Sequence, residues 1–446
     1  IHKGILEFLM NDRGGGDLKR VQFGRVSWMK ELEGKTLHDW AVMRGIDPRP
    51  EHAPPLVVEA MLAGGATMIY HIIDEGDVRR IMAHPQTMIA SDGRLTQPGD
   101  GRPHPRAYGT FPRVLGRYAR ELEVITLEQA VHGTLPLIED FRPDVVIGDL
   151  FGIVPSLAAE LAGSRRATLV PHVWPEYEDG VAPFNWGFLP SRSAAGRALW
   201  QAGRYLRDVQ RRRHRPLLNR ARERVGLAPL PGTRPPMSDE LVMVATYPQL
   251  EYPRPRPANV AVTGPMLFEV ASPEAELPPG DEPLVVVAGS TEQDSRHGLI
   301  AAALEGLASE PVRVLATINR QGASWPGPVP ANARVVDWAS YEQLLPLAAA
   351  MITRGGHGTI VRALSEGVPV LVCPSGGDQS ENGARVAWSG AGLMLPRRML
   401  GPERLRLAVR RLLADPGHAE RASELAAWGR EHDGAERGAE LLERFA

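Results

Sequence analysis

The sequence contains little cysteine, no surplus of either charge and no long apolar run. Its single cysteine, Cys373, excludes an intrachain disulfide framework and a multi-thiolate zinc site, and it favours a reducing compartment, the cytoplasm. Lys+Arg number 51 and Asp+Glu 53, so the net charge of -2 does not indicate nucleic acid or another polyanion as the main partner. No apolar run approaches the roughly 18 residues of a membrane span. A protein without a membrane span is expected.

Lysine is also scarce, and every lysine lies before residue 36. The 446 residues predict two or three domains, because a domain typically has roughly 100 to 200 residues. The pattern changes near residue 132, from irregular stretches such as Gly93–Arg106 to a regular alternation of apolar runs and helical patterns. That alternation predicts a parallel sheet flanked by helices. Residue 1 is Ile rather than Met, so we expect the reading frame to begin upstream.

The alternation is clearest after residue 281. Strands are predicted at Leu284–Ala288, Val312–Ala316, Arg334–Asp337, Ala350–Thr353, Val368–Cys373 and Gly392–Leu395. Helices are predicted between them, at Gly298–Ala308, Tyr341–Leu347, Gly358–Glu366, Gln379–Trp388 and Pro402–Ala414, followed by a pair of surface helices within Ala419–Phe445. This order predicts a complete doubly wound, Rossmann-like domain over residues 282–446.

A shorter α/β region occupies residues 132–270. Strands are predicted at Asp144–Gly148, Ala167–Pro171, Leu241–Thr246 and Val260–Thr263, with helices at Leu135–Phe141, Val154–Ala162 and Ala194–Val225. Proline-rich segments near residues 253–257 and 273–283 indicate the crossing into the last domain. The region is therefore interpreted as a partial α/β domain.

The stretch most informative for chemistry is Thr353–Thr359, a glycine-rich turn between a predicted strand and a predicted helix. Glycines allow a ligand to approach the backbone closely, and the first N–H groups of a helix favour an anion such as phosphate. Asp378 and Gln379 follow the next strand, and a carboxylate beside an amide suits the hydroxyl groups of a sugar. The two motifs together predict neighbouring phosphate and polyol sites.

The segments ALSEGVPVLVCP, GGDQSENGARV and GAGL follow the turn in order. Residues 132–446 thus resemble the UDP-glycosyltransferase superfamily in its bacterial natural-product branch. The resemblance implies the GT-B architecture, in which the C-terminal domain binds a nucleotide-diphosphate sugar and the N-terminal domain binds the acceptor. It further implies transfer of a hexose to a small hydroxylated acceptor with inversion, without a metal or another cofactor.

The resemblance also assigns roles to particular residues. Ser290 and Thr291, after Gly289, match a second diphosphate contact, and Trp338 matches the aromatic residue at the nucleotide base. The phosphate loop corresponds to Arg354, Gly356, His357, Gly358 and Thr359, and the pair that holds the donor sugar corresponds to Asp378 and Gln379.

Two positions depart from the family pattern. Arg354 stands where many members have His, and His357 could share its role of neutralising the diphosphate. Arg362 stands where many members have Glu for the ribose hydroxyls, and a cation cannot accept those hydrogen bonds. The second departure leaves the nucleotide preference open.

The family's catalytic dyad is only half represented. Asp149 matches the aspartate that orients the base, whereas no histidine matches the base itself, which the family places just after the first strand of its N-terminal domain. The βα units that open that domain are not recognisable before residue 132. His172 is the N-domain histidine that could substitute, although a structural or acceptor-lining role is favoured.

Residues 1–131 resemble another family, through MIYHIIDEGDVRRIMAHPQTMIASDG and the segment after it. They are similar to the C-terminal part of a zinc-dependent N-acyl-D-amino-acid deacylase, an amidohydrolase with a TIM barrel. Asp92 matches that family's catalytic aspartate. A barrel needs about 250 residues, the chain has no His-x-His pair, and Asp92 with His71 or His104 makes no recognisable zinc site. Zinc is expected only if deacylase activity exists.

The resemblance changes family within a few residues of Val131, which indicates a chimeric reading frame. We therefore expect three regions, a deacylase-like fragment at 1–131, a partial acceptor domain at 132–270 and a donor domain at 282–446. A glycosyltransferase with weak or absent transfer activity is the favoured interpretation. The alternatives are an amidohydrolase fragment and a catalytically inactive protein that binds a nucleotide sugar.

Overall fold

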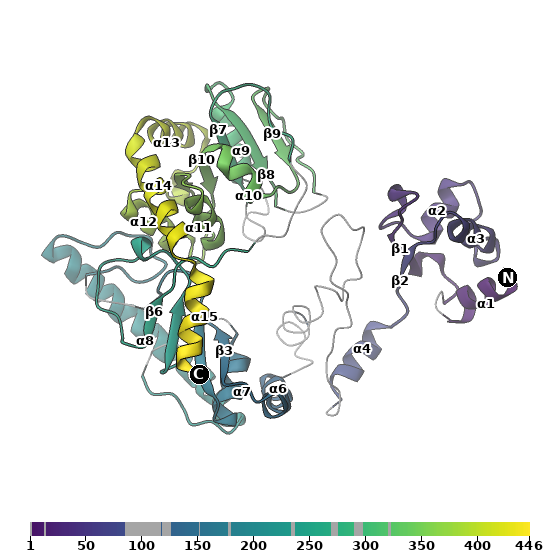
Figure 1. Cartoon of the computed structure of the whole chain (residues 1–446), viewed down its shortest axis with the longest axis horizontal. Helices are drawn as coiled ribbons and strands as arrows, with labels where there is room; N and C mark the ends of the chain where they lie inside the picture. Colours follow the sequence, from purple (N-terminus) through teal and green to yellow (C-terminus); the bar gives the residue numbers. More distant parts are fainter. Residues whose placement is uncertain are drawn as a thin grey trace. The chain divides into compact units, whose positions relative to one another are not determined.

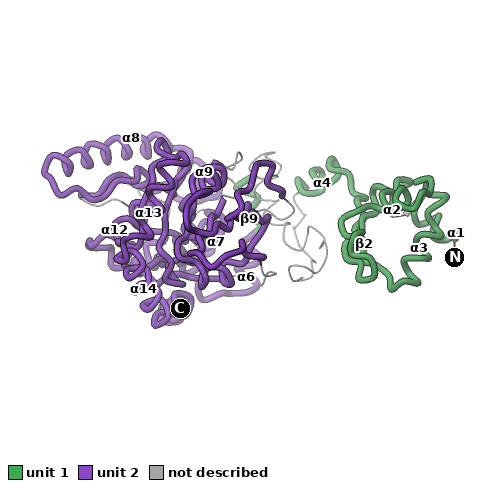
Figure 2. Tube along the Cα trace, turned by 90° about the horizontal axis from the view of Figure 1, so that it is seen from above, with its two compact units in different colours: residues 1–133, 270–272 green, residues 134–269, 273–446 purple. Residues whose placement is uncertain are grey.

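The structure, a computed structural model, describes residues 2–12, 15–84, 117, 126–150, 152–176, 180–232, 237–268, 275–289, 298–319 and 323–446. The chain forms two compact units (Figure 2). Unit 1 comprises Ile1–Gly133 with Val270–Ser272, and unit 2 comprises Thr134–Glu269 with Pro273–Ala446. The boundary falls within helix α6 (Leu127–Phe141).

Unit 1 is a small α/β assembly around the aromatic residues Phe23 and Trp40, both buried. Strand β1 (Val21–Arg25) pairs antiparallel with β2 (Thr67–Tyr70). The helical segments within residues 2–84 are α1 (His2–Glu7), η1 (Phe8–Asp12), η2 (Leu18–Arg20), η3 (Lys30–Leu32), α2 (Leu37–Met43), η4 (Pro50–His52), α3 (Pro54–Leu62) and α4 (Glu75–Met82). TIM-barrel strands run parallel, so the described part of this unit does not show the barrel-derived structure that was expected.

Unit 2 contains two parallel sheets (Figure 1). The first has the order β3-β4-β5-β6, with β3 (Val145–Asp149), β4 (Arg165–Val170), β5 (Leu241–Val244) and β6 (Val260–Val262). Its helical segments include α7 (Ile153–Ala162), the 31-residue α8 (Ala194–Arg224) and η6 (Pro248–Leu250). The strands predicted for this region are confirmed to within two residues at each end.

The second sheet has the order β12-β11-β10-β7-β8-β9 and is parallel throughout. Its strands are β7 (Leu284–Ala288), β8 (Arg313–Thr317), β9 (Ala333–Val336), β10 (Ala348–Thr353), β11 (Val370–Val372) and β12 (Gly392–Met394). The helical segments are α9 (Gly298–Leu307), α10 (Tyr341–Leu344), η7 (Leu345–Leu347), α11 (His357–Ser365), α12 (Gln379–Ser389), η8 (Arg397–Met399), α13 (Pro402–Ala414), α14 (Pro416–Glu431) and α15 (Gly434–Phe445). Buried aliphatic cores cover both faces of this sheet, as its continuous apolar strands predict.

The two C-terminal helices are present, but α15 does not merely lie on the surface. Leu442 and Phe445 pack with Ala167 and Met243 of the first sheet, and Arg165 donates to the Phe445 carbonyl. Figure 1 shows α15 returning from the second sheet to the first. Helix α15 therefore contributes to the core around the first sheet.

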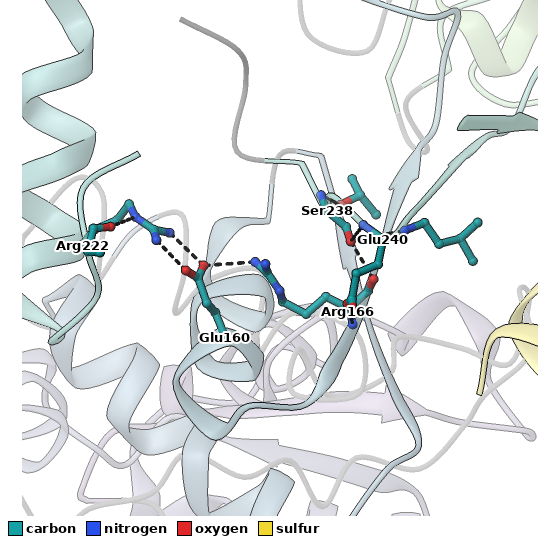
Figure 3. Close-up of polar contacts among 8 residues, drawn as sticks. Glu160, Arg166, Arg222, Ser238 and Glu240 are labelled. Carbon is teal, nitrogen blue, oxygen red and sulfur yellow. Dashed lines mark hydrogen bonds and ion pairs between the residues drawn. The ribbon is translucent and has the colours of Figure 1, made fainter. Parts of the chain in front are cut away.

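An ion cluster anchors α8 to the first sheet (Figure 3). Glu160 on α7 accepts two hydrogen bonds from Arg222 on α8 (2.5 and 2.9 Å) and one from Arg166 on β4 (3.0 Å). The hydrogen bond from Arg222 is the main cause that lowers the pKa of Glu160. Ser238 and Glu240 bind the Arg166 backbone, which ties the segment before β5 to the same strand.

Candidate functional site

The second sheet reverses its strand order between β7 and β10, which are neighbours although three strands apart in sequence. Open parallel sheets bind ligands at such a switch point, outside the carboxyl ends of the strands. The glycine-rich turn after β10 and Gly289 after β7 both lie at this edge. The predicted phosphate motif is thus positioned where the topology favours a ligand.

The turn after β10 requires glycine at one position. Gly355 has φ +98°, and a Cβ there would lie 2.6 Å from Val372 Cγ1 and 3.1 Å from the Gln379 carbonyl oxygen. The Gly355 N–H donates to Thr353 Oγ1 (3.2 Å), which closes the turn onto the end of β10. Any side chain at Gly355 would strain the backbone and collide with the neighbouring strand.

Helix α11 presents free amide groups to the same edge. Its first intrahelical bond runs from Ile360 N–H to the Gly356 carbonyl (3.1 Å), so the amides of His357, Gly358 and Thr359 have no acceptor within the helix. A Cβ at Gly356 or Gly358 would have no atom within 4 Å among the described residues. Space for a ligand therefore adjoins donors that favour an anion.

Arg354 and His357 differ in what they contribute. Arg354 is buried and donates from Nη1 to the Cys373 carbonyl at the end of β11 (3.4 Å), so its cation lies at the carboxyl edge. His357 is buried as well, and its Nε2 lies 2.9 Å from Thr246 Oγ1. Burial, with a smaller contribution from His172, lowers the pKa of His357 to about 3. A ring with so low a pKa is neutral at neutral pH, so the positive charge near the turn comes from Arg354.

Asp378 and Gln379 begin α12 beside the turn. Asp378 is the N-cap residue, and its carboxylate accepts from Asn382 Nδ2 (2.9 Å). The carbonyl oxygen of the Gln379 side chain accepts from the amide and the hydroxyl of Ser375 (2.8 Å each). That oxygen is therefore occupied in shaping the loop, and Nε2 is the part of Gln379 that could donate to a sugar.

Asn382 is a site residue that the sequence did not reveal. Its Nδ2 donates both to Asp378 Oδ2 and to the Gly355 carbonyl (2.9 Å each). One buried amide group thus connects the phosphate turn with the proposed sugar pair. The spacing of four residues from Asp378 was the only available signal, since Gly355 is 27 residues away in sequence.

The other end of the site is formed by β7, β8 and β9. Asn319 Nδ2 donates to the Gly289 carbonyl and to the Tyr341 hydroxyl (2.8 Å each), which fixes the backbone just after β7. Trp338 follows β9 and is 42% exposed. Ser290 and Thr291 lie outside the described residues.

The first sheet contributes His172 and Asp149. His172 follows β4, lies 5.6 Å from the Phe184 ring in a stacked arrangement, and contacts the Val173 carbonyl through Nδ1 (2.7 Å). A carbonyl only accepts, so this contact favours the tautomer with the proton on Nδ1, in which Nε2 is unprotonated. Asp149 is exposed at the end of β3, in register with Leu169 of β4. Both residues lie at the carboxyl edge of the first sheet.

A buried ion cluster holds α12 against the segment that follows His172. Glu251 accepts from Arg385 Nη1 (2.9 Å) and from the Trp174 amide (2.7 Å), and Arg254 lies 3.3 Å away. Arg385 also pairs with Glu381 (2.8 Å), and its guanidinium lies 3.9 Å from the centre of the Tyr252 ring. Glu251 thereby connects α12, which begins next to the turn after β10, with the segment that follows His172.

The deacylase residues do not form a site in the described part of unit 1. Asp92 and His104 lie outside the described residues, and His71 is exposed with Nε2 3.0 Å from Gln22 Oε1. Among the residues that the structure describes, no three His, Cys, Asp or Glu side chains come together as a metal site. Nor does any described helix have the length and apolarity to cross a bilayer.

Comparison with known proteins agrees with this geometry. Residues 302–431 match the family of the erythromycin biosynthesis protein CIII-like C-terminal domain. The chain is 33% identical over 309 residues to 4'-demethylrebeccamycin synthase of Lentzea aerocolonigenes, covering 65% of this chain and 71% of that protein. It therefore belongs to the glycosyltransferases of bacterial natural-product type, which have the GT-B fold.

Solved structures show the same fold. The glycosyltransferase of kitacinnamycin superimposes with a TM-score of 0.58 at 25% identity, covering 75% of this chain and 84% of the other. The glycosyltransferase VinC, solved in complex with dTDP, superimposes with a TM-score of 0.50 at 21% identity, covering 88% of this chain and 95% of the other. The two parallel sheets of unit 2 are thus the two Rossmann-like sheets of GT-B.

A second match is confined to a shorter segment. The chain is 46% identical over 112 residues to D-aminoacylase of Alcaligenes xylosoxydans xylosoxydans, which is 24% of this chain and 20% of that protein. The predicted resemblance to a deacylase is confirmed at the level of sequence. The chain spans about a fifth of that relative.

Proposed function

We propose that unit 2 binds a nucleotide-diphosphate sugar at the carboxyl edge of its second sheet and that the family reaction is transfer of a hexose to a small hydroxylated acceptor. The observation that carries the proposal is the coupling of two motifs through Asn382, which binds the phosphate turn at Gly355 and the carboxylate of Asp378. Asn382 thus holds the proposed diphosphate and sugar contacts next to each other.

The donor's diphosphate is assigned to the start of α11. The free amides of residues 357–359 and the Thr359 hydroxyl donate to its oxygens, and Arg354 supplies positive charge nearby. Ser290 and Thr291 remain proposed contacts on the other side. Because His357 is neutral, its contribution is its main-chain amide. VinC bound to dTDP has the same fold, which supports a nucleoside diphosphate as ligand.

The sugar and the base are assigned to the flanking elements. Asp378 accepts hydrogen bonds from sugar hydroxyls, and Gln379 donates through Nε2. The exposed ring of Trp338 stacks on the nucleotide base. We also retain the proposed division into an acceptor domain at 132–270 and a donor domain at 282–446.

Transfer would proceed by direct displacement with inversion. An acceptor oxygen attacks the anomeric carbon, the bond to the diphosphate breaks with its electron pair, and a base removes the acceptor proton. Asp149 stands at the proposed dyad position, but no histidine matches the family's base. Positioned proton transfer typically contributes 10²- to 10⁴-fold, so we propose that donor binding is retained while transfer is slower by about that factor.

His172 is the proposed substitute base. Its Nε2 carries the electron pair that a base requires, and its segment is held next to α12 through Trp174 and Glu251. Robust turnover that His172→Ala abolishes, with dTDP affinity unchanged, would establish this role. Turnover that survives His172→Ala would assign the histidine to the structure of the acceptor side.

The second candidate function, deacylation of an N-acyl-D-amino acid, rests on the match to D-aminoacylase. We propose that residues 1–131 are a fragment of that family without its activity, because a barrel needs about 250 residues. Purified protein should contain well under one zinc per chain. Stoichiometric zinc that Asp92→Ala removes would make deacylation the leading function.

Calorimetric titration with dTDP, UDP and the matching sugar nucleotides tests the donor site. Thr359→Val should weaken every one of these ligands about tenfold or more, since it removes a hydrogen bond to a charged group. Asp378→Ala should weaken the sugar nucleotides alone. Lack of binding by any nucleoside diphosphate at millimolar concentration would refute the donor site. Identical losses in both variants would refute the assignment of Thr359 to the diphosphate and of Asp378 to the sugar.

A further inference from the structure

Helix α8 concentrates positive charge in a chain whose net charge is close to zero. Its 31 residues include ten arginines and only two acids, Asp208 and Glu223. The whole chain has a net charge of -2, so the remainder is more acidic than the average suggests. In both views α8 extends beyond the other elements of unit 2 (Figure 1, Figure 2). The low net charge of the whole chain therefore hides a strongly basic helix.

One face of α8 is committed to the fold. A Cβ at Gly203 would lie 2.8 Å from the Trp186 ring, which shows how closely the helix approaches the loop before it. Arg207 donates to the Phe184 carbonyl (2.7 Å), Arg211 pairs with Glu176 (3.1 Å), and Arg222 binds Glu160. These arginines stabilise the unit and are not available to a partner.

The opposite face presents arginines that have no acidic partner among the described residues. Arg212, Arg213 and Arg220 are exposed, and none of them forms an ion pair with a described residue. Arg212, Arg215 and Arg220 line an open hollow of about 470 Å³ that also contacts Pro216, Asn219, Glu223 and Gly232. Burial, followed by the charges of Arg211 and Arg222, lowers the pKa of Arg215. An anion in the hollow would relieve this crowding of like charges.

Large apolar side chains interrupt the charges on the exposed face. Leu199, Tyr205, Leu206 and Leu217 are each more than half exposed, and Leu199 and Leu206 are two helical turns apart on one side. The adjoining loop adds Trp186, Phe188 and Leu189, which are 40 to 52% exposed, with both aromatic rings packed against Trp200. Exposed apolar residues in such a group indicate an interaction surface.

We propose that this surface, the outer face of α8 with residues 186–189, docks onto an anionic phospholipid bilayer. Lipid phosphates pair with the guanidinium groups of Arg212 and Arg213, while leucine, tyrosine and tryptophan side chains enter the boundary between headgroups and acyl chains. A second copy of the chain would bring two arginine-rich helices together, which like-charge repulsion opposes. An acidic protein would satisfy the arginines but would not require the intervening leucines.

Vesicle co-sedimentation of the full chain tests the proposal. The protein should bind vesicles of phosphatidylcholine mixed with phosphatidylglycerol and should not bind vesicles of phosphatidylcholine alone. Binding should weaken as salt is added, because surface charges are screened. Binding that is equal for both vesicle types, or absent for both, would overturn the proposal without any variant.

Matched variants assign the binding to this face. Arg212→Gln with Arg213→Gln should lower vesicle affinity about thirty-fold, since each arginine near the surface contributes about fivefold. Leu206→Ser should lower it about tenfold. The controls are on α13, where Arg404 and Arg411 are exposed and Leu407 is 53% exposed. Arg404→Gln with Arg411→Gln, and Leu407→Ser, should leave the affinity unchanged.

Two outcomes would reject the bilayer as the partner. Equal losses in the α8 and α13 variants would mean that binding follows total charge rather than this surface. Capture by immobilised polyglutamate that the Arg212 and Arg213 substitutions abolish and Leu206→Ser leaves intact, without vesicle binding, would assign the surface to an acidic protein. Neither outcome depends on donor binding, so the proposed glycosyltransferase site stands or fails separately.

Discussion

The two parallel sheets of unit 2 use similar strands in different surroundings. All five residues of β7 are buried at the centre of the six-stranded sheet. Strand β3 has a comparable sequence, VVIGD, but it lies at the edge of the four-stranded sheet, and Ile147 is 46% exposed. An apolar strand sequence thus favours a buried position, but the neighbouring elements determine whether the strand is buried.

The uncovered edge extends onto the preceding helix. Leu137 and Phe141 of α6 are 62% and 84% exposed, and together with Val145 and Ile147 they line an open hollow of about 460 Å³. Within the described residues, β3 pairs only with β4. Unpaired apolar edges favour association with another strand. The second sheet should therefore dominate stability, and the first should be more prone to aggregation.

The strongest test asks whether the two sheets unfold together. Glu251→Ala would leave Arg385 and Arg254 buried without their shared partner, which should reduce the free energy of unfolding by about 3 to 5 kcal/mol. Urea unfolding followed by tryptophan fluorescence measures the loss. One cooperative transition at lower urea is expected. Two separate transitions already in the unsubstituted protein would show that the sheets unfold independently.

A matched pair of isoleucines compares the sheets directly. Ile352 on β10 is fully buried, so Ile352→Ala should lower the free energy of unfolding by about 2 to 5 kcal/mol. Ile147 on β3 is half-exposed, and Ile147→Ala should lower it by less than about 1 kcal/mol. The same urea measurement serves both variants. Equal losses would mean that the edge of β3 is covered in solution.

Acidification should act on the contact between the sheets. The folded pKa of His357 is about 3, below the ordinary value of 6.5. The unfolded chain therefore binds the proton first, and stability present above pH 6.5 is lost as the pH falls toward 3. Between pH 6.5 and pH 5 the loss should be about 2 kcal/mol. His357→Gln should lack this increment, and an unchanged pH dependence would contradict burial of the ring.

The smallest effect is expected from a charge on the exposed edge. Ile147→Lys on β3, where the side chain is already 46% exposed, should change the free energy of unfolding by no more than about 0.5 kcal/mol. It should nevertheless reduce self-association, because a lysine on an edge strand opposes pairing with another strand. Light scattering during concentration measures the effect. Scattering identical to that of the unsubstituted protein would show that β3 is not the associating edge.

The second sheet could be predicted closely from the sequence. Strands buried on both faces appear as short continuous apolar runs, and the runs at residues 284–288 and 350–353 lie within two residues of β7 and β10. The turn was predicted from its glycines, and Gly355 does adopt a positive φ, which glycine tolerates. Short sequence patterns were sufficient for the strands and for this turn, because their conformation depends on neighbouring residues in the sequence.

The contacts that organise the site could not be predicted in this way. Asn382 binds a carbonyl 27 residues away, and Glu251 pairs with an arginine 134 residues away. Such pairings depend on the packing of α12 and leave no periodic signal. Nor did the sequence show that the His357 ring, at the start of α11, is directed to Thr246 and away from water.

The return of α15 to the first sheet restricts how the two sheets can move. The backbone crosses between them after β6 and again between α14 and α15, and the crossings touch at Gly264 and Gly434. A Cβ on Gly434 would lie 2.4 Å from the carbonyl oxygens of Gly264 and Pro265. Two connections that touch at one place act as a single hinge between the sheets. A motion of the two sheets relative to each other should thus be a rotation about Gly264 and Gly434, and a bulky residue at either glycine would restrict it.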